Sequence, residues 1–196
     1  MTTSASSLPP GYTLRNMTAA EFFPLFEKHY DRIFGQDHVF FADRYYSETE
    51  KAKAKILSDK RGDIFTLHLG IFSPENEFVA FSFGFQETED NFYVACSAVV
   101  EEKRNLGLYS ALLDYTIETC REQGFQVIYG THCATNNAVI VPKLKKGFVI
   151  SKMECSDIFG VVLHVCYFTN PLRRKVMDYR SGHRKPDEEL KKIFKF

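Results

Sequence analysis

Residues 99–113, which read VVEEKRNLGLYSALL, are expected to join a strand to a helix through a basic turn that contains a glycine. Successive backbone N–H groups at the N-terminus of a helix bind anions, and the helix dipole strengthens such a site. Gly107 leaves room for a phosphate to approach the backbone, and Lys103 and Arg104 add positive charge. The stretch therefore predicts a phosphate-binding loop. The alternative is an ordinary strand-to-helix connection with a solvated basic turn.

The segments around this loop alternate between helix-like and strand-like patterns. Two capping boxes, Thr18 with Glu21 and Ser47 with Glu50, predict the starts of two helices, the second ending near residue 57. Apolar spacing and turn residues predict two more helices at 107–122 and 136–146. Alternating or β-branched residues predict strands at 12–16, 64–72, 77–86, 92–100, 127–130, 148–157 and 161–169. The order β-α-α-β-β-β-α-β-α-β-β, followed by a C-terminal extension, favours an α/β sandwich.

Glycine and proline punctuate these segments. Gly124 and Gly147 stand where C-terminal caps of helices belong. Pro24 predicts that the first helix starts late or kinks, and Pro142 predicts an interruption in the helix at 136–146.

Charge is balanced over the whole chain but uneven along it. With 25 basic and 25 acidic residues the formal net charge is zero, which argues against general electrostatic binding to nucleic acid or to an anionic membrane. Residues 171–196 nevertheless hold nine Lys or Arg and four Asp or Glu, so the part before them has 16 basic and 21 acidic residues. The basic extension is either a solvated, partly helical tail or a docking surface for an acidic partner.

Size and cysteine usage suggest one domain in a reducing compartment. The 196 residues divide into a flexible lead-in at 1–11, a domain at 12–170 and the extension at 171–196. Five cysteines without a C-x-x-C spacing predict neither a disulfide framework nor a zinc site, and no metal is expected. The beginning of the chain lacks the pattern of a signal peptide, and no apolar run is long enough to span a bilayer. We therefore expect a cytoplasmic protein.

A second motif, NNAVIVPKLKKGF at residues 136–148, follows the first at a characteristic distance. The ordered pair resembles the GNAT superfamily of N-acetyltransferases. Its pyrophosphate loop reads Q/R-x-x-G-x-G/A, which this chain matches at Arg104 and Gly107 and leaves at Tyr109, where the family has a small residue. The family's second signature is an Asn, here Asn136, about twelve residues before a Gly-Phe pair. The resemblance covers residues 94–169 well and the N-terminal half by element order alone.

The resemblance implies a fold and a cofactor site. The fold would be a GNAT-like three-layer α/β sandwich whose mixed, mostly antiparallel sheet splays between strands 4 and 5. Acetyl-CoA, or another acyl-CoA, would be the co-substrate, with its pantetheine arm on unpaired backbone groups of the splayed strand. By resemblance, the residues that bind it are Ser97, Ala98, Val99, Arg104, Asn105, Leu106, Gly107, Leu108, Tyr109, Ser110 and Asn136. Asn136 would cap the following helix, contact the pantetheine, or do both.

The implied activity is direct transfer of an acyl group from the thioester to an amine of a small molecule or peptide. An alternative is an acyl-CoA-binding module without catalytic activity, because this chain has Lys143 where the family usually has the Tyr that acts as general acid. A nucleic-acid-associated role for residues 171–196 is disfavoured, since the rest of the chain is net acidic. The sequence leaves a homodimer open.

Candidate acids and bases follow from this reaction. Lys143 could protonate the departing thiolate if its pKa were lowered, although a solvent-facing helix residue is the alternative; Tyr109 is a substitute acid. His132 is the candidate base, because a His suits proton transfer near neutral pH, and the alternative is a structural His that braces the loop before Asn136. Cys133 is adjacent to it and would point to the other face of a strand, so we do not expect covalent catalysis.

The acceptor site would be built from aromatic residues of the N-terminal helices. Most are expected to pack in the core, and some to line an apolar pocket. The candidates are Phe22, Phe23, Phe26, Tyr30, Phe34, Phe40, Phe41, Tyr45 and Tyr46.

Overall fold

A seven-stranded mixed sheet forms the centre of the molecule in a computed structural model that describes residues 8–34 and 42–195. The strand order is β1-β2-β3-β4-β5-β7-β6, and only β4 and β5 run parallel. The strands are β1 (Thr13–Asn16), β2 (Thr66–Phe72), β3 (Phe78–Gln86), β4 (Asn91–Val99), β5 (Val127–Cys133), β6 (Val149–Ser156) and β7 (Gly160–Phe168). The mixed, mostly antiparallel sheet predicted from the sequence is confirmed.

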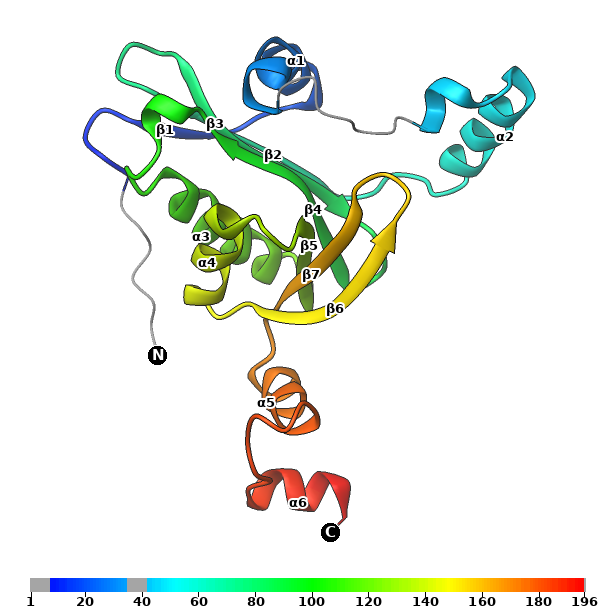
Figure 1. The fold of residues 1–196 in the computed structure, drawn as a ribbon, viewed down its shortest axis with the longest axis vertical. Coiled ribbons are helices and arrows are strands. Elements are labelled where there is room, and N and C mark those ends of the chain that lie inside the picture. Colours follow the sequence, from blue (N-terminus) through cyan, green and yellow to red (C-terminus); the bar gives the residue numbers. More distant parts are fainter. Residues whose placement is uncertain (1–7, 35–41, 196) are drawn as a thin grey trace.

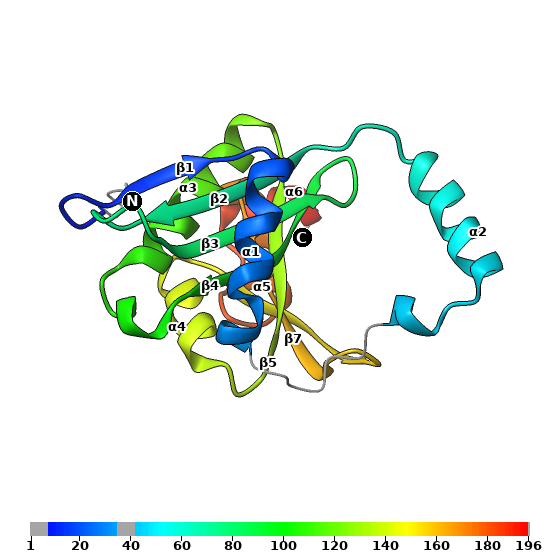
Figure 2. The ribbon, with the colours of Figure 1, turned by 90° about the horizontal axis from the view of Figure 1, so that it is seen from above.

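Helices lie on both faces of this sheet and give three layers (Figures 1 and 2). α3 and α4 cover one face, and α1 crosses β2, β3 and β4 on the other. The helices are α1 (Ala19–Phe34), α2 (Glu48–Asp59), α3 (Leu108–Glu122), α4 (Asn137–Lys145), α5 (Pro171–Arg180) and α6 (Glu188–Phe194). Two short 3₁₀ helices occur at Ala42–Tyr45 and Glu101–Lys103. Among the helices of the described residues, none combines the length and apolar content that crossing a membrane requires.

Two separate apolar clusters hold the helices to the sheet. The larger lies under α3 and α4 and includes Leu108, Leu112 and Ile128. The smaller lies under α1, where Phe22 is fully buried and contacts the rings of Phe78 and Phe81. Burying such a ring stabilises the fold by about 1.5–3 kcal/mol, so tertiary packing fixes α1 in place.

The two prolines do not shape their helices as predicted. α1 begins at Ala19, directly after Thr18 of the Thr18–Glu21 capping box, and continues through Pro24. α4 likewise continues through Pro142. The expected late start of the first helix and the expected interruption of the helix at 136–146 are therefore wrong. In α1 the packing of Phe22 and Phe26 against the sheet compensates for the backbone hydrogen bond that a proline cannot donate.

The sheet opens where β4 leaves β5. The two strands pair over three residues only, from Asn91 opposite Val127 to Tyr93 opposite Tyr129. β4 also carries an extra residue at Ala95, because Gly84 pairs with Val94 whereas Phe83 pairs with Cys96. Such a bulge bends its strand and increases the twist. Beyond Tyr93, β4 has a neighbouring strand on the β3 side alone.

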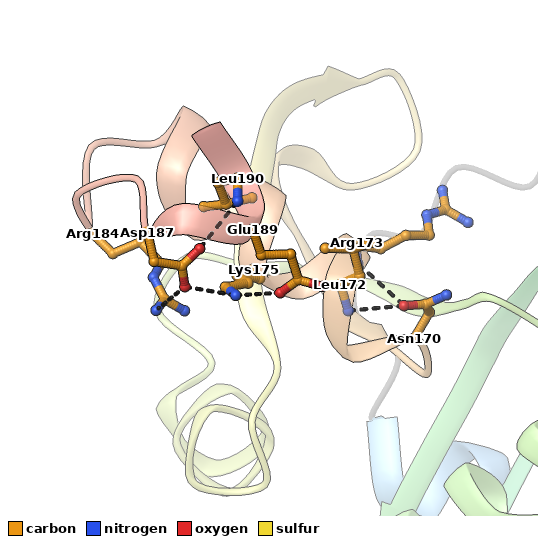
Figure 3. A network of polar contacts seen from close by, with 8 residues as sticks. All are labelled: Asn170, Leu172, Arg173, Lys175, Arg184, Asp187, Glu189 and Leu190. Carbon is orange, nitrogen blue, oxygen red and sulfur yellow. Dashed lines mark hydrogen bonds and ion pairs between the residues drawn. The ribbon is translucent and has the colours of Figure 1, made fainter. Parts of the chain in front are cut away.

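The C-terminal extension is a pair of helices and not a loose tail (Figure 3). Asn170 caps α5 by accepting from the backbone N–H groups of Leu172 and Arg173. Lys175 of α5 forms ion pairs with Asp187 and Glu189, which lie at the start of α6. The side chain of Leu190 is fully buried, and the ring of Phe194 contacts that of Tyr179. These contacts oppose part of the basic excess with acidic side chains of the extension itself.

Candidate active site

The predicted phosphate loop connects β4 to α3 with two residues in the left-handed region. Asn105 has a φ of 63° and Gly107, the residue before the helix, has a φ of 79°. Within the described residues no heavy atom lies within 4 Å of the position that a Cβ of Gly107 would occupy. No side chain caps the first turn of α3, so its N-terminal N–H groups face open space without a side-chain acceptor. Such a terminus can accept an anion.

Arg104 folds back from this loop toward the splayed strand. Its Nε lies 3.4 Å from the carbonyl oxygen of Val99, the last residue of β4. Ser97, two residues earlier, places its hydroxyl 2.8 Å from that of Ser82 on β3. The Arg104 side chain thus joins the loop to the end of β4, which has no strand partner on the β5 side.

Lys143 of α4 lies beside Gly130 of β5, where β4 and β5 separate, and its side chain is fully buried. Its Nζ is 2.8 Å from Nε2 of His132 and 5.3 Å from the centre of the Phe148 ring. Burial disfavours the charged ammonium and lowers the pKa of Lys143 to about 7. The alternative that Lys143 is a solvent-facing helix residue is therefore wrong. The sequence left this open because Lys145 and Lys146 follow closely, and only the rotation of α4 decides which lysine faces the sheet.

His132 is the hydrogen-bonding partner of this lysine. Burial, and then the neighbouring charge of Lys143, lowers the pKa of His132 to about 3. Because an ammonium has donors only, Nε2 of His132 accepts the hydrogen bond from Lys143 whenever that lysine is protonated. The structure thus brings together two residues that the sequence nominated separately, one from β5 and one from α4.

Gly130 is a residue of this site that the sequence analysis did not single out. A Cβ at this position would lie 3.0 Å from Nζ of Lys143 and 3.0 Å from the carbonyl oxygen of Val94. The close approach of β4, β5 and α4 therefore requires the absence of a side chain at Gly130. A glycine inside a strand was the available signal, since it often marks such an approach.

The remaining candidates are more widely spread. Within the described residues, the buried hydroxyl of Tyr109 has no hydrogen-bond partner, and burial raises its pKa. Asn136 precedes α4 without a capping hydrogen bond from its side chain, so its predicted role as a side-chain cap is not observed. Cys133 is exposed at the end of β5 and pairs in register with Val162, while His132 pairs with Leu163.

The N-terminal aromatic residues divide between core and surface. Phe22 and Phe26 pack on the sheet, as expected for most of them. Tyr45 and Tyr46 are exposed beside α2, which has no buried residue and extends from the body of the molecule (Figure 2). The side chain of Phe34, together with Phe40 and Phe41, lies outside the described residues.

Comparison with known proteins identifies the architecture. The model of the acetyltransferase (GNAT) family matches residues 17–148. Among solved structures, Ard1 from Thermoplasma volcanium is 18% identical, with a TM-score of 0.57 over 82% of this chain and 99% of that chain. The ribosomal-protein-S18-alanine N-acetyltransferase from Escherichia coli is 17% identical, with a TM-score of 0.57 over 80% of this chain and 93% of that chain. A putative acetyltransferase from Salmonella typhimurium, solved with its cofactor acetyl-CoA, is 13% identical, with a TM-score of 0.59 over 82% and 95%. These identities show a shared fold, and no protein of curated function matches the sequence.

Proposed function

Because this chain belongs to the GNAT acetyltransferase family, we propose that it is an N-acyltransferase that moves an acyl group, in the simplest case acetyl, from coenzyme A directly to an amine. The observation that carries the proposal is the buried Lys143, whose Nζ lies beside Gly130 at the point where β4 and β5 separate. The acyltransferase domain would span residues 12–170, with 171–196 as an extension.

The geometry of the loop fits an acyl-CoA. Backbone N–H groups from Arg104 to Ser110 would hold the pyrophosphate, since the first turn of α3 lacks a side-chain cap and Gly107 adds no bulk. Residues 97–99 would hold the pantetheine arm with backbone groups that have no strand partner on the β5 side. Asn136, whose side chain is free of a capping bond, would contact the same arm.

Lys143 is the proposed acid of the reaction. Bound acyl-CoA supplies an electrophilic thioester carbonyl and a thiolate leaving group. A pKa of about 7 allows Lys143 to hold a proton at neutral pH and to release it readily. Tyr109 is a weaker candidate, because its buried hydroxyl has a raised pKa and gives up a proton less readily.

His132 is proposed to act with Lys143. Its Nε2 orients the ammonium, and its lowered pKa keeps the imidazole neutral, so that it accepts this hydrogen bond while Lys143 is protonated. A base role for His132, which the sequence predicts, would require the imidazole to exchange Lys143 for the acceptor amine as its partner. We therefore favour His132 as a positioning residue.

The test of this function is thiol release from acetyl-CoA in the presence of a panel of small-molecule and peptide amines. An acyltransferase releases free thiol in proportion to the acylated amine, and mass spectrometry identifies the acylated product. An idle binding module would bind acetyl-CoA, seen as a raised melting temperature, and release no thiol with any amine. The second outcome would overturn the proposal.

A further inference from the structure

A second cluster of chemistry-bearing side chains lies at the vertex of the opening, on the face opposite α4. Tyr93 and Tyr129 form the last pair of the β4–β5 ladder, with ring centroids 5.1 Å apart. Tyr93 contacts the ring of Phe85, which lies on the same face of β3 as the residues packed under α1. Its hydroxyl is 3.1 Å from that of Thr131. The two tyrosine rings therefore form a half-buried aromatic wall beside the gap.

His164 extends this wall onto β7. It pairs in register with Thr131, and its ring stacks on Tyr129 with a centroid distance of 5.6 Å and an angle of 8° between the planes. Its Nε2 is 3.0 Å from a carboxylate oxygen of Glu154 on β6. An ionised carboxylate can only accept, so Nε2 carries the proton and Nδ1 carries the lone pair. Within the described residues, no hydrogen bond to Nδ1 is found.

The imidazoles of His132 and His164 thus differ in whether their acceptor nitrogen is already engaged in a contact. On the α4 face, the acceptor nitrogen of His132 already contacts Lys143, a cation. On the other face, His164 is oriented by an anion and retains a free lone pair, with its side chain 14% exposed. A general base needs a lone pair that is not already engaged and a group that fixes the ring. Within the described residues, Nδ1 of His164 meets the first condition and Glu154 supplies the second.

The surroundings of His164 suit a positively charged acceptor. Glu154 and Glu87 lie on two sides of the aromatic wall, and the hydroxyl of Tyr129 donates to Glu87. Lys152 pairs with Glu154 at 2.7 Å, whereas no ion pair of Glu87 is found within the described residues. Aromatic faces and carboxylates together attract an ammonium group. The titratable groups that face His164 are Tyr129 from β5 and Lys152 and Glu154 from β6.

We propose that the acceptor is a primary amine that arrives as an ammonium ion on this face, and that Nδ1 of His164 takes its proton while Glu154 holds the ring. This inference rests on the proposed function. The neutral amine nitrogen forms a bond to the thioester carbon, and the C–S bond breaks. The first proton of the ammonium passes from His164 to solvent, and the nitrogen loses a second proton to His164 as the amide forms. The thiolate receives a proton from Lys143, which is then reprotonated from solvent. The products are an amide and a free thiol.

The test compares His164→Gln with a matched control, His183→Gln, in the exposed C-terminal extension. His164→Gln should lower thiol release with a primary alkylamine by roughly two to four decades, while the melting shift given by acetyl-CoA is retained. The loss should be far smaller with hydroxylamine, which is largely unprotonated at neutral pH, and it should shrink as the pH is raised. A structural role would lower the rates with both acceptors equally.

A second measurement does not depend on turnover. In the free protein, long-range ¹H–¹⁵N spectra of the neutral His164 imidazole should show the proton on Nε2, and Glu154→Gln should weaken this preference. Equal losses with alkylamine and hydroxylamine, or a proton on Nδ1, would overturn the assignment of His164 while the wild-type activity stands. A wild-type protein that acylates no amine would instead overturn the proposed function itself.

Discussion

The two faces of the sheet at the β4–β5 opening carry similar residue types in different environments. On the α4 face, Lys143 of α4 contacts His132 of β5, and burial lowers the pKa of each. On the α1 face, His164 contacts Glu154, and their side chains are 14% and 41% exposed. In the proposed mechanism, burial and the sign of the neighbouring charge, and not residue type, distinguish the proton donor on one face from the proton acceptor on the other.

Replacing Lys143 should have the largest effect on activity. A small effect would contradict the assignment of the proton donor to the α4 face. Lys143→Met keeps most of the side-chain volume but cannot donate a proton. We expect thiol release to fall by roughly two to four decades, and the decline in rate above a pH of about 7 to disappear. Lys145→Met, on the exposed side of the same helix, is the control and should keep both the rate and the pH profile.

A substitution in the phosphate loop tests whether acetyl-CoA binds on the face of the sheet that α3 and α4 cover. A ligand at 100 times its dissociation constant stabilises the native state by about 2.7 kcal/mol. Gly107→Glu places a bulky anion where the phosphate would lie, so the melting shift given by acetyl-CoA should vanish.

The matched control for the loop is Gly182→Glu. Gly182 also has a positive φ and open space around it, but it lies in the C-terminal extension. A shift that survives in Gly107→Glu, or is lost equally in both variants, would contradict the loop assignment.

The stability of the protein should depend on pH through Lys143. Its pKa is about 7 in the folded protein, against an ordinary value of 10.5, so between these values the unfolded chain binds more protons than the native one. The free energy of unfolding should therefore rise with pH across this window, by on the order of 1 kcal/mol per pH unit, and lose this contribution as the pH falls to 7.

Denaturant titrations at several pH values measure this dependence. The rise should be reduced in Lys143→Met and preserved in Lys145→Met. An identical pH dependence in wild type and Lys143→Met would mean that Lys143 is not held in the environment described above.

Replacing Tyr109 should have the smallest effect on turnover, and this result would distinguish Lys143 from Tyr109 as the acid. Its hydroxyl is buried without a partner in the described residues, and an unsatisfied polar group costs stability. Tyr109→Phe should therefore raise the free energy of unfolding by about 1 kcal/mol or less and leave turnover nearly unchanged. Tyr115→Phe, at an exposed position of the same helix, is the control. A loss of turnover as large as that of Lys143→Met would transfer the acid role to Tyr109.

Local patterns predicted most of the elements of this fold. The two capping boxes are present as hydrogen-bonded pairs, and the helix after the loop begins one residue from the predicted start. The sequence nominated Lys143 as a candidate acid but did not predict its burial, because α4 has little amphipathic pattern and two further lysines follow closely. β5 is longer than predicted and continues to Cys133, because its last residues pair with β7.

By itself, the sequence determined the order of the elements, the family and the loop around Gly107, because these depend on short-range spacing, capping and glycine. The tertiary structure alone decided which side chains meet. Lys143 reaches His132 because α4 packs across β5. His164 meets both Glu154 and Tyr129 because β7 lies between its hairpin partner β6 and the more distant β5 in the sheet. Contacts of this kind depend on packing between distant segments, which no local pattern encodes.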